Sequence, residues 1–175
     1  MNFSTKARLH VCPLARIDEF VEATGARSLV TLLNQGTPVT RPPAIRPERH
    51  LFIAMSDIVD PMDGHILPGE RHVGDLLAFV GDWDRAEPLL IHCFAGVSRS
   101  TAAAFIAACA LQPTRRQAEI ALAIRAASPT ATPNVRLVAI ADKILGRSGR
   151  MIEAVTAIGR GETCDTGVPF GLEVG

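Results

Sequence analysis

A cysteine and an arginine with a C-x5-R spacing stand in the segment HCFAGVSRS at positions 92–100. The spacing alone is weak evidence, because Cys109 and Arg115 repeat it. That second pair begins inside a helical pattern and contains no glycine, so we interpret it as a coincidence. The pair Cys93 and Arg99 has different surroundings: a short apolar run precedes it, a glycine lies within it, and an alanine-rich helical pattern follows. This pair is therefore the chain's first candidate for chemistry.

A loop that runs from a buried strand into the N-terminus of a helix can bind an anion. Its successive backbone N–H groups point into one concavity, where the helix dipole adds about half a positive charge. Gly96 allows such a loop to turn without a clash from a Cβ atom. We therefore expect this loop to bind a phosphate group. The candidate phosphate-binding residues are Phe94, Ala95, Gly96, Val97, Ser98 and Arg99.

Cys93 and Arg99 would act on that phosphate in different ways. The planar guanidinium group of Arg99 can hold two phosphate oxygens at once, which a lysine ammonium cannot do. Cys93 would lie beneath the phosphorus atom, at the base of the loop. The loop N–H groups, the helix dipole and Arg99 all favour the thiolate form, which is a ready nucleophile. The pattern thus predicts attack by a cysteine on a bound phosphate.

The segment resembles the H-C-x-x-G-x-x-R-S/T signature of the cysteine-dependent protein tyrosine phosphatases, specifically their compact, bacterial, dual-specificity-like branch. The matching residues are His92, Cys93, Gly96, Arg99 and Ser100. Upstream, FIAMSD (52–57) is similar to the family's strand that ends in the general-acid aspartate. Downstream, ASPTATPN (127–134) is similar to the Pro-Asn segment that opens the next helix. The resemblance covers roughly residues 50–145.

This resemblance implies a phosphomonoester hydrolase that needs no metal or other cofactor and forms a phosphocysteine intermediate. Cys93 would attack phosphorus, and an aspartic acid would protonate the leaving oxygen before activating the hydrolytic water. Ser100 would stabilise the departing thiolate, while His92 and Asn134 would hold the loop in shape. The implied substrates are phosphotyrosine or phosphotyrosine/phosphoserine-type groups of a protein, or a small phosphomonoester. The alternatives are a catalytically weak phosphate-binding module and an inositol-phosphate phosphatase, although the loop has no lysine to bind additional phosphates.

The resemblance leaves the choice of the general acid open, because the candidates Asp57, Asp60 and Asp63 all follow the apolar run 51–55. They precede Cys93 by 36, 33 and 30 positions (93−57, 93−60 and 93−63). The family's usual spacing favours Asp60 or Asp63. Asp57 alone follows directly on the strand, as the family's acid does. We predict that Asp57 is the general acid, with Asp60 as the alternative.

Composition limits the remaining function classes. The 175 residues include 18 Lys plus Arg and 18 Asp plus Glu, for a net charge of zero, which disfavours nucleic acid as a partner. No apolar run approaches the ~20 residues of a membrane span, and the N-terminus has no secretory pattern. We therefore expect a cytoplasmic protein. Cys12, Cys109 and Cys164 lack zinc-site spacing and are predicted to be structural thiols. The oligomeric state is not predicted.

The elements that must position the cysteine loop follow from apolar periodicity. Strands are predicted at 9–13, 28–33, 51–55 and 89–91, with helices at 15–24 and 73–83 between them. Further helices are predicted at 102–111, 114–127, 134–145 and 150–158. The order predicts an α/β fold with a small central, mainly parallel sheet flanked by helices and a helical C-terminal half. One catalytic domain is expected over residues 1–160, with a loop-like tail over 161–175.

Overall fold

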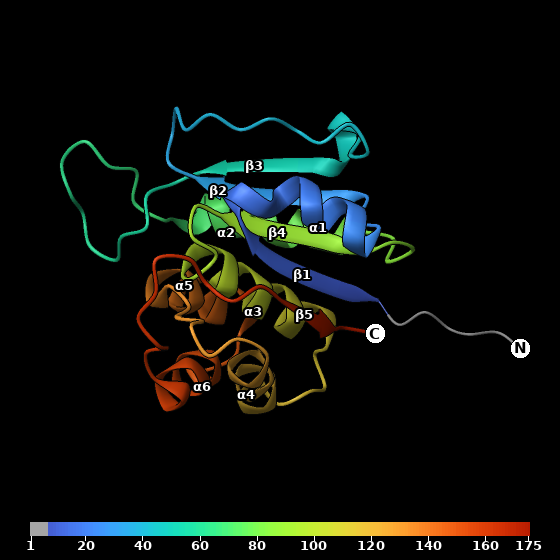
Figure 1. Cartoon of the computed structure of the whole chain (residues 1–175). Coiled ribbons are helices and arrows are strands. Elements are labelled where there is room, and N and C mark those ends of the chain that lie inside the picture. Colours follow the sequence, from blue (N-terminus) through green and yellow to red (C-terminus); the bar gives the residue numbers. More distant parts are fainter. Residues whose placement is uncertain (1–6) are drawn as a thin grey trace, which may run out of the picture.

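The computed structural model describes residues 7–175 and is built around a five-stranded sheet in the order β3-β2-β4-β1-β5 (Figure 1). The strands are β1 (Arg8–Pro13), β2 (Ser28–Leu33), β3 (His50–Ala54), β4 (Leu89–Cys93) and β5 (Phe170–Glu173). The first four strands run parallel, and β5 pairs antiparallel with β1. The predicted mainly parallel α/β sheet is thus confirmed.

Helices cover both faces of the sheet. α1 (Ile17–Thr24) packs Ile17 and Val21 on one face. α2 (Glu70–Asp82) and α3 (Arg99–Leu111) lie on the other. The predicted central helix is confirmed, because α3 is buried almost all round, with α4 (Gln117–Ala127) and α5 (Val135–Leu145) packed against it. α6 (Arg150–Ile158) packs on α4 and α5 at the outside of the same layer (Figure 1). Parallel strands covered on both faces explain the near-continuous apolar runs of the sequence.

Several predicted helix starts are wrong by a few residues. α3 begins at Arg99 and α2 at Glu70, each three positions before the predicted start. α2 starts early because the Nδ1 atom of His72 accepts a hydrogen bond from Gly69 N–H and caps the first turn. α4 begins three positions late, because Arg115 N–H bonds to the carbonyl of Gln112 and closes a turn before the helix.

The C-terminal segment is a part of the sheet, which corrects the predicted loop-like tail over 161–175. Phe170–Glu173 forms β5, whose residues Phe170 and Leu172 are both buried. The run FGLE is short and contains a glycine, so its strand character is weak in the sequence. The expected domain over 1–160 stays a prediction, and its residues 1–6 lie outside the described part of the chain.

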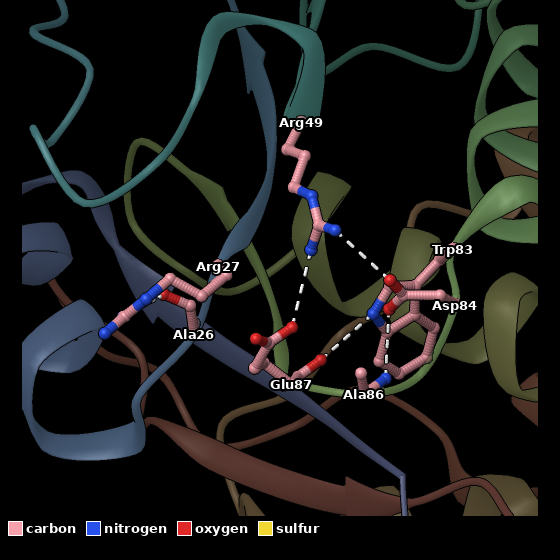
Figure 2. A network of polar contacts seen from close by, with 7 residues as sticks. All are labelled: Ala26, Arg27, Arg49, Trp83, Asp84, Ala86 and Glu87. Carbon is pink, nitrogen blue, oxygen red and sulfur yellow. Dashed lines mark hydrogen bonds and ion pairs between the residues drawn. The ribbon is translucent and has the colours of Figure 1, made fainter.

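A polar network holds the amino-terminal ends of β3 and β4 together (Figure 2). Arg49, in the short 3-10 helix Pro47–Arg49, pairs with Asp84 and Glu87 in the connection from α2 to β4. The indole N–H of Trp83 donates to the carbonyl of Glu87 at 3.0 Å. These surface ion pairs contribute little free energy of folding by themselves, but buried Trp83 anchors the connection to the core.

Within residues 7–175, no helix is long and apolar enough to cross a membrane.

Candidate active site

The carboxyl ends of the parallel strands meet at one edge of the sheet, where α/β folds commonly bind ligands. β4 ends at Cys93, and residues 94–98 then lead directly into α3. We call residues 94–98 the cysteine loop. Asn34 follows β2 at the same edge, and Asp57 lies three residues beyond the end of β3. The sequence order thus brings the candidate nucleophile, the candidate acid and a polar amide to one place.

Backbone N–H groups from other segments bind four of the five carbonyl groups of the cysteine loop. The bonds join Leu14 N to Phe94 O (3.1 Å), Gly167 N to Ala95 O (2.8 Å), Thr132 N to Val97 O (2.9 Å) and Asn134 N to Ser98 O (3.1 Å). In a trans peptide the C=O and the following N–H point in opposite directions. The N–H groups that follow these carbonyls, at positions 95, 96, 98 and 99, therefore point away from the surrounding segments, as an anion-binding loop requires.

Gly96 is needed for this turn. Its φ angle is +72°, and a Cβ atom there would lie 3.0 Å from the backbone nitrogen of Pro13. The Gly96 N–H donates to the Sγ atom of Cys93 at 3.3 Å. Cys93 is only 3% exposed, and its Sγ lies 3.1 Å from the hydroxyl oxygen of Ser100. The sulfur therefore lies at the base of the loop between two groups that can stabilise a thiolate.

Hydrogen bonds from one nitrogen of its guanidinium group, Nη1, hold Arg99 in place. Its Nη1 donates to Oδ1 of Asn34 at 2.7 Å and to the carbonyl of Met55 at 2.8 Å. Its Nε is buried and has no hydrogen-bond partner in the described residues. An unpaired buried N–H is costly. The edge formed by Nε and Nη2 is the bidentate edge of the group, so a phosphate in the loop would satisfy it.

Sequence reasoning missed Asn34. Its only sequence signal is that a polar residue directly follows the buried strand 28–33. The interaction that matters joins it to Arg99, 65 positions away, and local patterns do not report such a contact.

Asp57 lies beside the cysteine loop. Its Oδ1 accepts hydrogen bonds from the Ser98 hydroxyl at 2.7 Å and from Nδ2 of Asn134 at 2.9 Å. Asn134 also caps α5, because its Oδ1 accepts from the N–H groups of Arg136 and Leu137. Both bonds to Asp57 fall on Oδ1, and within residues 7–175 no hydrogen bond engages Oδ2, which is therefore available to carry a proton.

The other two candidate aspartates lie farther along the connection from β3 to α2, which projects from the body at the left of Figure 1. Asp60 and Asp63 are both exposed. Asp60 lines a groove together with Asp57 and Ser98. Neither side chain makes a hydrogen bond to the cysteine loop.

A pocket of about 460 Å³ opens beside the loop. Its walls come from the ends of β2 and β3, the connection after β3, and the loop itself. Asp57, Arg99, His65 and the uncharged residues Leu33, Asn34, Thr37, Ser56, Ile58 and Phe94 line it. Arg99 is therefore its one permanently cationic lining residue. Phe94, which is 64% exposed, offers an aromatic surface at the rim.

None of the predicted structural thiols is among the residues that line this pocket. Cys12 and Cys109 are fully buried, and burial raises the pKa of each thiol to about 12. Both therefore stay protonated at neutral pH, unlike a catalytic thiolate. Cys164 is half-buried in the segment before β5.

Gly167 is a second residue that the sequence did not indicate, and it supports the loop from the C-terminal segment. Its N–H donates to the Ala95 carbonyl, and a Cβ atom at this position would lie 2.4 Å from the carbonyl oxygen of Gly96.

We predict that Gly167→Ala displaces the loop and lowers kcat/KM for a phosphomonoester about 10- to 100-fold. Gly74→Ala in α2 is the matched control, because its added Cβ meets nothing within 4 Å. Equal activity of the two variants would contradict the supporting role of Gly167.

The fold is that of the cysteine-dependent protein tyrosine phosphatases, in particular their dual-specificity branch. The structure is similar to human DUSP28, with a TM-score of 0.60 and 20% identity over 80% of this chain and 89% of that one. It is also similar to the Yvh1 phosphatase domain from Chaetomium thermophilum (TM-score 0.59, 17% identity, 85% and 96% of the two chains). PTPMT1 in complex with PI(5)P gives a TM-score of 0.56 at 14% identity, over 84% and 90% of the two chains.

No protein-family model and no curated protein sequence matches this chain. At the identities found among solved structures, the likeness establishes the fold alone. The resemblance predicted from HCFAGVSRS is confirmed at that level, and the chemistry must be argued from the site.

Proposed function

We propose that this protein is a phosphomonoester hydrolase that acts through a phosphocysteine intermediate. The observation that carries the proposal is the cysteine loop itself: the Gly96 N–H donates to the Cys93 sulfur, neighbouring segments bind the loop carbonyls, and the buried Nε of Arg99, the residue that follows the loop, has no partner among the described residues. This arrangement suits a phosphate dianion above a nucleophilic sulfur. The loop contains no second cysteine that could form a disulfide with Cys93, which argues against a thiol oxidoreductase.

In the first step, the Cys93 thiolate attacks phosphorus and forms a sulfur–phosphorus bond. The bond between phosphorus and the leaving oxygen breaks, and its electron pair goes to that oxygen. Oδ2 of protonated Asp57 supplies the proton that makes it a neutral alcohol or phenol. The loop N–H groups and Arg99 stabilise the charge on the three non-bridging oxygens of the transferred phosphoryl group.

In the second step, a water molecule attacks the phosphocysteine, and Asp57, now a carboxylate, takes one of its protons. The sulfur–phosphorus bond breaks, and its electron pair returns to sulfur. The hydroxyl of Ser100, 3.1 Å from Sγ, and the N–H of Gly96 then stabilise the thiolate. Inorganic phosphate leaves, and the enzyme returns to its starting form.

The pocket favours a substrate with a single phosphate, of the phosphotyrosine or phosphotyrosine/phosphoserine type. Arg99 is the only permanent cation among its lining residues, so no second permanent positive charge is available there for an additional phosphate group. Exposed Phe94 at the rim can pack against an aromatic ring. PTPMT1 has been solved with PI(5)P, which keeps an inositol-lipid phosphatase as the second candidate. Comparing kcat/KM for phosphopeptides, inositol phosphates and nucleotides separates them, and a preference for inositol phosphates would overturn the first.

Hydrolysis of para-nitrophenyl phosphate in the presence of EDTA tests the activity. We expect turnover that survives chelation and is inhibited by vanadate, which mimics a pentacoordinate phosphorus. Phosphate binding without turnover would instead identify a catalytically weak binding module. Turnover abolished by EDTA would contradict the cysteine mechanism.

Arg99 should be irreplaceable by another cation. We predict that Arg99→Lys lowers kcat/KM about 10²- to 10³-fold, because a lysine keeps the charge but cannot donate from a planar fork. Arg115→Lys is the control, because Arg115 has the same spacing from a cysteine and lies outside the pocket. Steady-state kinetics on both variants measures the effect, and nearly wild-type activity of Arg99→Lys would refute the bidentate role.

A further inference from the structure

A chain of hydrogen bonds crosses three neighbouring strands behind the cysteine loop. His92 on β4 is fully buried, and its Nε2 lies 2.7 Å from the hydroxyl oxygen of Thr31 on β2. The same hydroxyl oxygen lies 2.7 Å from Nε2 of His50 on β3. On the other side of its ring, His92 Nδ1 lies 3.2 Å from the carbonyl oxygen of Cys93. Thr31 and His92 are paired in the β2–β4 register.

The direction of every bond in this chain can be deduced. A carbonyl oxygen only accepts, so Nδ1 of His92 must carry a proton. Burial is the main cause that lowers the pKa of His92, to about 4, so the ring is neutral at physiological pH and its Nε2 is an acceptor. The single hydroxyl proton of Thr31 is then donated to that Nε2. The Nε2 of His50 must therefore donate to the Thr31 oxygen.

The consequence reaches the first peptide of the cysteine loop. Backbone N–H groups hold the carbonyls of Phe94, Ala95, Val97 and Ser98, whereas the Cys93 carbonyl is held by the side chain of His92. Fixing this carbonyl also fixes the N–H of Phe94, which points in the opposite direction across the peptide. In the other neutral tautomer, the lone pair of Nδ1 would face the carbonyl oxygen, and the bond would be lost.

We propose that Thr31, oriented by His50, is a positioning residue that holds His92 in its Nδ1–H tautomer and thereby fixes the Cys93–Phe94 peptide for phosphate binding. Its effect on catalysis rests on the proposed phosphatase function. The tautomer itself does not rest on that function, and a spectrum of the resting protein reports it.

Long-range 1H–15N spectra of the histidine rings test the hydrogen-bond chain directly, with signals assigned through His92→Asn and His50→Asn. At neutral pH we expect His92 to be protonated at Nδ1 alone and His50 to be protonated at Nε2. A His92 ring that is protonated at Nε2, or that averages between both tautomers, would overturn the proposal whatever the activity of the protein.

Variants of Thr31 test the catalytic consequence. Thr31→Val keeps the shape and removes the hydroxyl, and we expect mixed His92 tautomers and a kcat/KM about 10- to 100-fold lower. Thr31→Ser restores the hydroxyl and should restore both the spectrum and the activity. Thr24→Val is the control, because it removes a comparable hydroxyl bond, to the Phe20 carbonyl, in α1.

The outcomes separate this inference from the proposed function. Unchanged kcat/KM in a folded Thr31→Val variant would overturn the positioning role, as would failure of Thr31→Ser to recover activity. If Thr31→Val does not fold, the activity of Thr31→Ser and the wild-type spectrum still test the positioning role of Thr31. Absence of phosphatase activity in the wild-type protein would refute the proposed function, whereas the tautomer measurement would stand.

Discussion

Replacing Cys93 with serine is expected to reduce kcat for phosphomonoester hydrolysis by at least about 10⁴-fold, because a hydroxyl in this loop is a far weaker nucleophile than a thiolate. The loop N–H groups and Arg99 are untouched by the change. Binding of phosphate or vanadate should therefore persist, measured by calorimetry on the variant. Loss of turnover with retained binding is the signature of a missing nucleophile.

Cys109→Ser is the matched control for this prediction. Cys109 has the same C-x5-R spacing and is fully buried in α3, but it has no anion-binding loop around it. Its replacement should change stability more than activity. If Cys109→Ser and Cys93→Ser lost activity equally in folded protein, the assignment of the nucleophile to Cys93 would be wrong.

Replacing Asp57 with alanine should cost about 10²- to 10⁴-fold in kcat for substrates with poor leaving groups, since the leaving oxygen would no longer receive a proton. The loss should shrink for substrates whose leaving group is acidic enough to depart without one. Rates across a series of aryl phosphates with graded leaving groups measure this dependence. The reactivity of Cys93 toward an alkylating reagent should be retained.

Asp60→Ala and Asp63→Ala provide the comparison. All three aspartates are exposed, but Asp57 alone is held against the loop, by Ser98 and Asn134. We expect nearly wild-type rates from both variants. A leaving-group-dependent loss in Asp60→Ala, with Asp57→Ala unaffected, would transfer the role of the acid to Asp60.

The parts of this site that lie close together in the chain could be predicted from the sequence. The segment HCFAGVSRS contains the strand end, the turn glycine, the helix start and the two chemical side chains within nine positions (92–100). The fold could be predicted because strands and helices alternate with clear apolar periodicity in the first half of the chain. Asp57 could be favoured because it directly follows a strand pattern, and its role stays a prediction.

The groups that shape the loop could not be predicted, because they come from distant parts of the chain. The loop carbonyls are bound by the backbone of Leu14, Thr132, Asn134 and Gly167, and Arg99 is fixed by Asn34. Backbone donors have no sequence signature, so their positions emerge only when the elements pack. The C-terminal segment was misjudged for the same reason: β5 exists because β1 offers it an edge, and its own four residues give little indication of a strand.

Isolation of the phosphoenzyme tests the central claim most directly. Asp57→Ala, which should lose the group that activates water, is mixed with an activated aryl phosphate, quenched rapidly and digested for mass spectrometry. We predict one phosphoryl group on the sulfur of Cys93, with no such product when Cys93 is also replaced by serine. Rapid turnover without modification of Cys93, or a phosphoryl group on another residue, would contradict the mechanism.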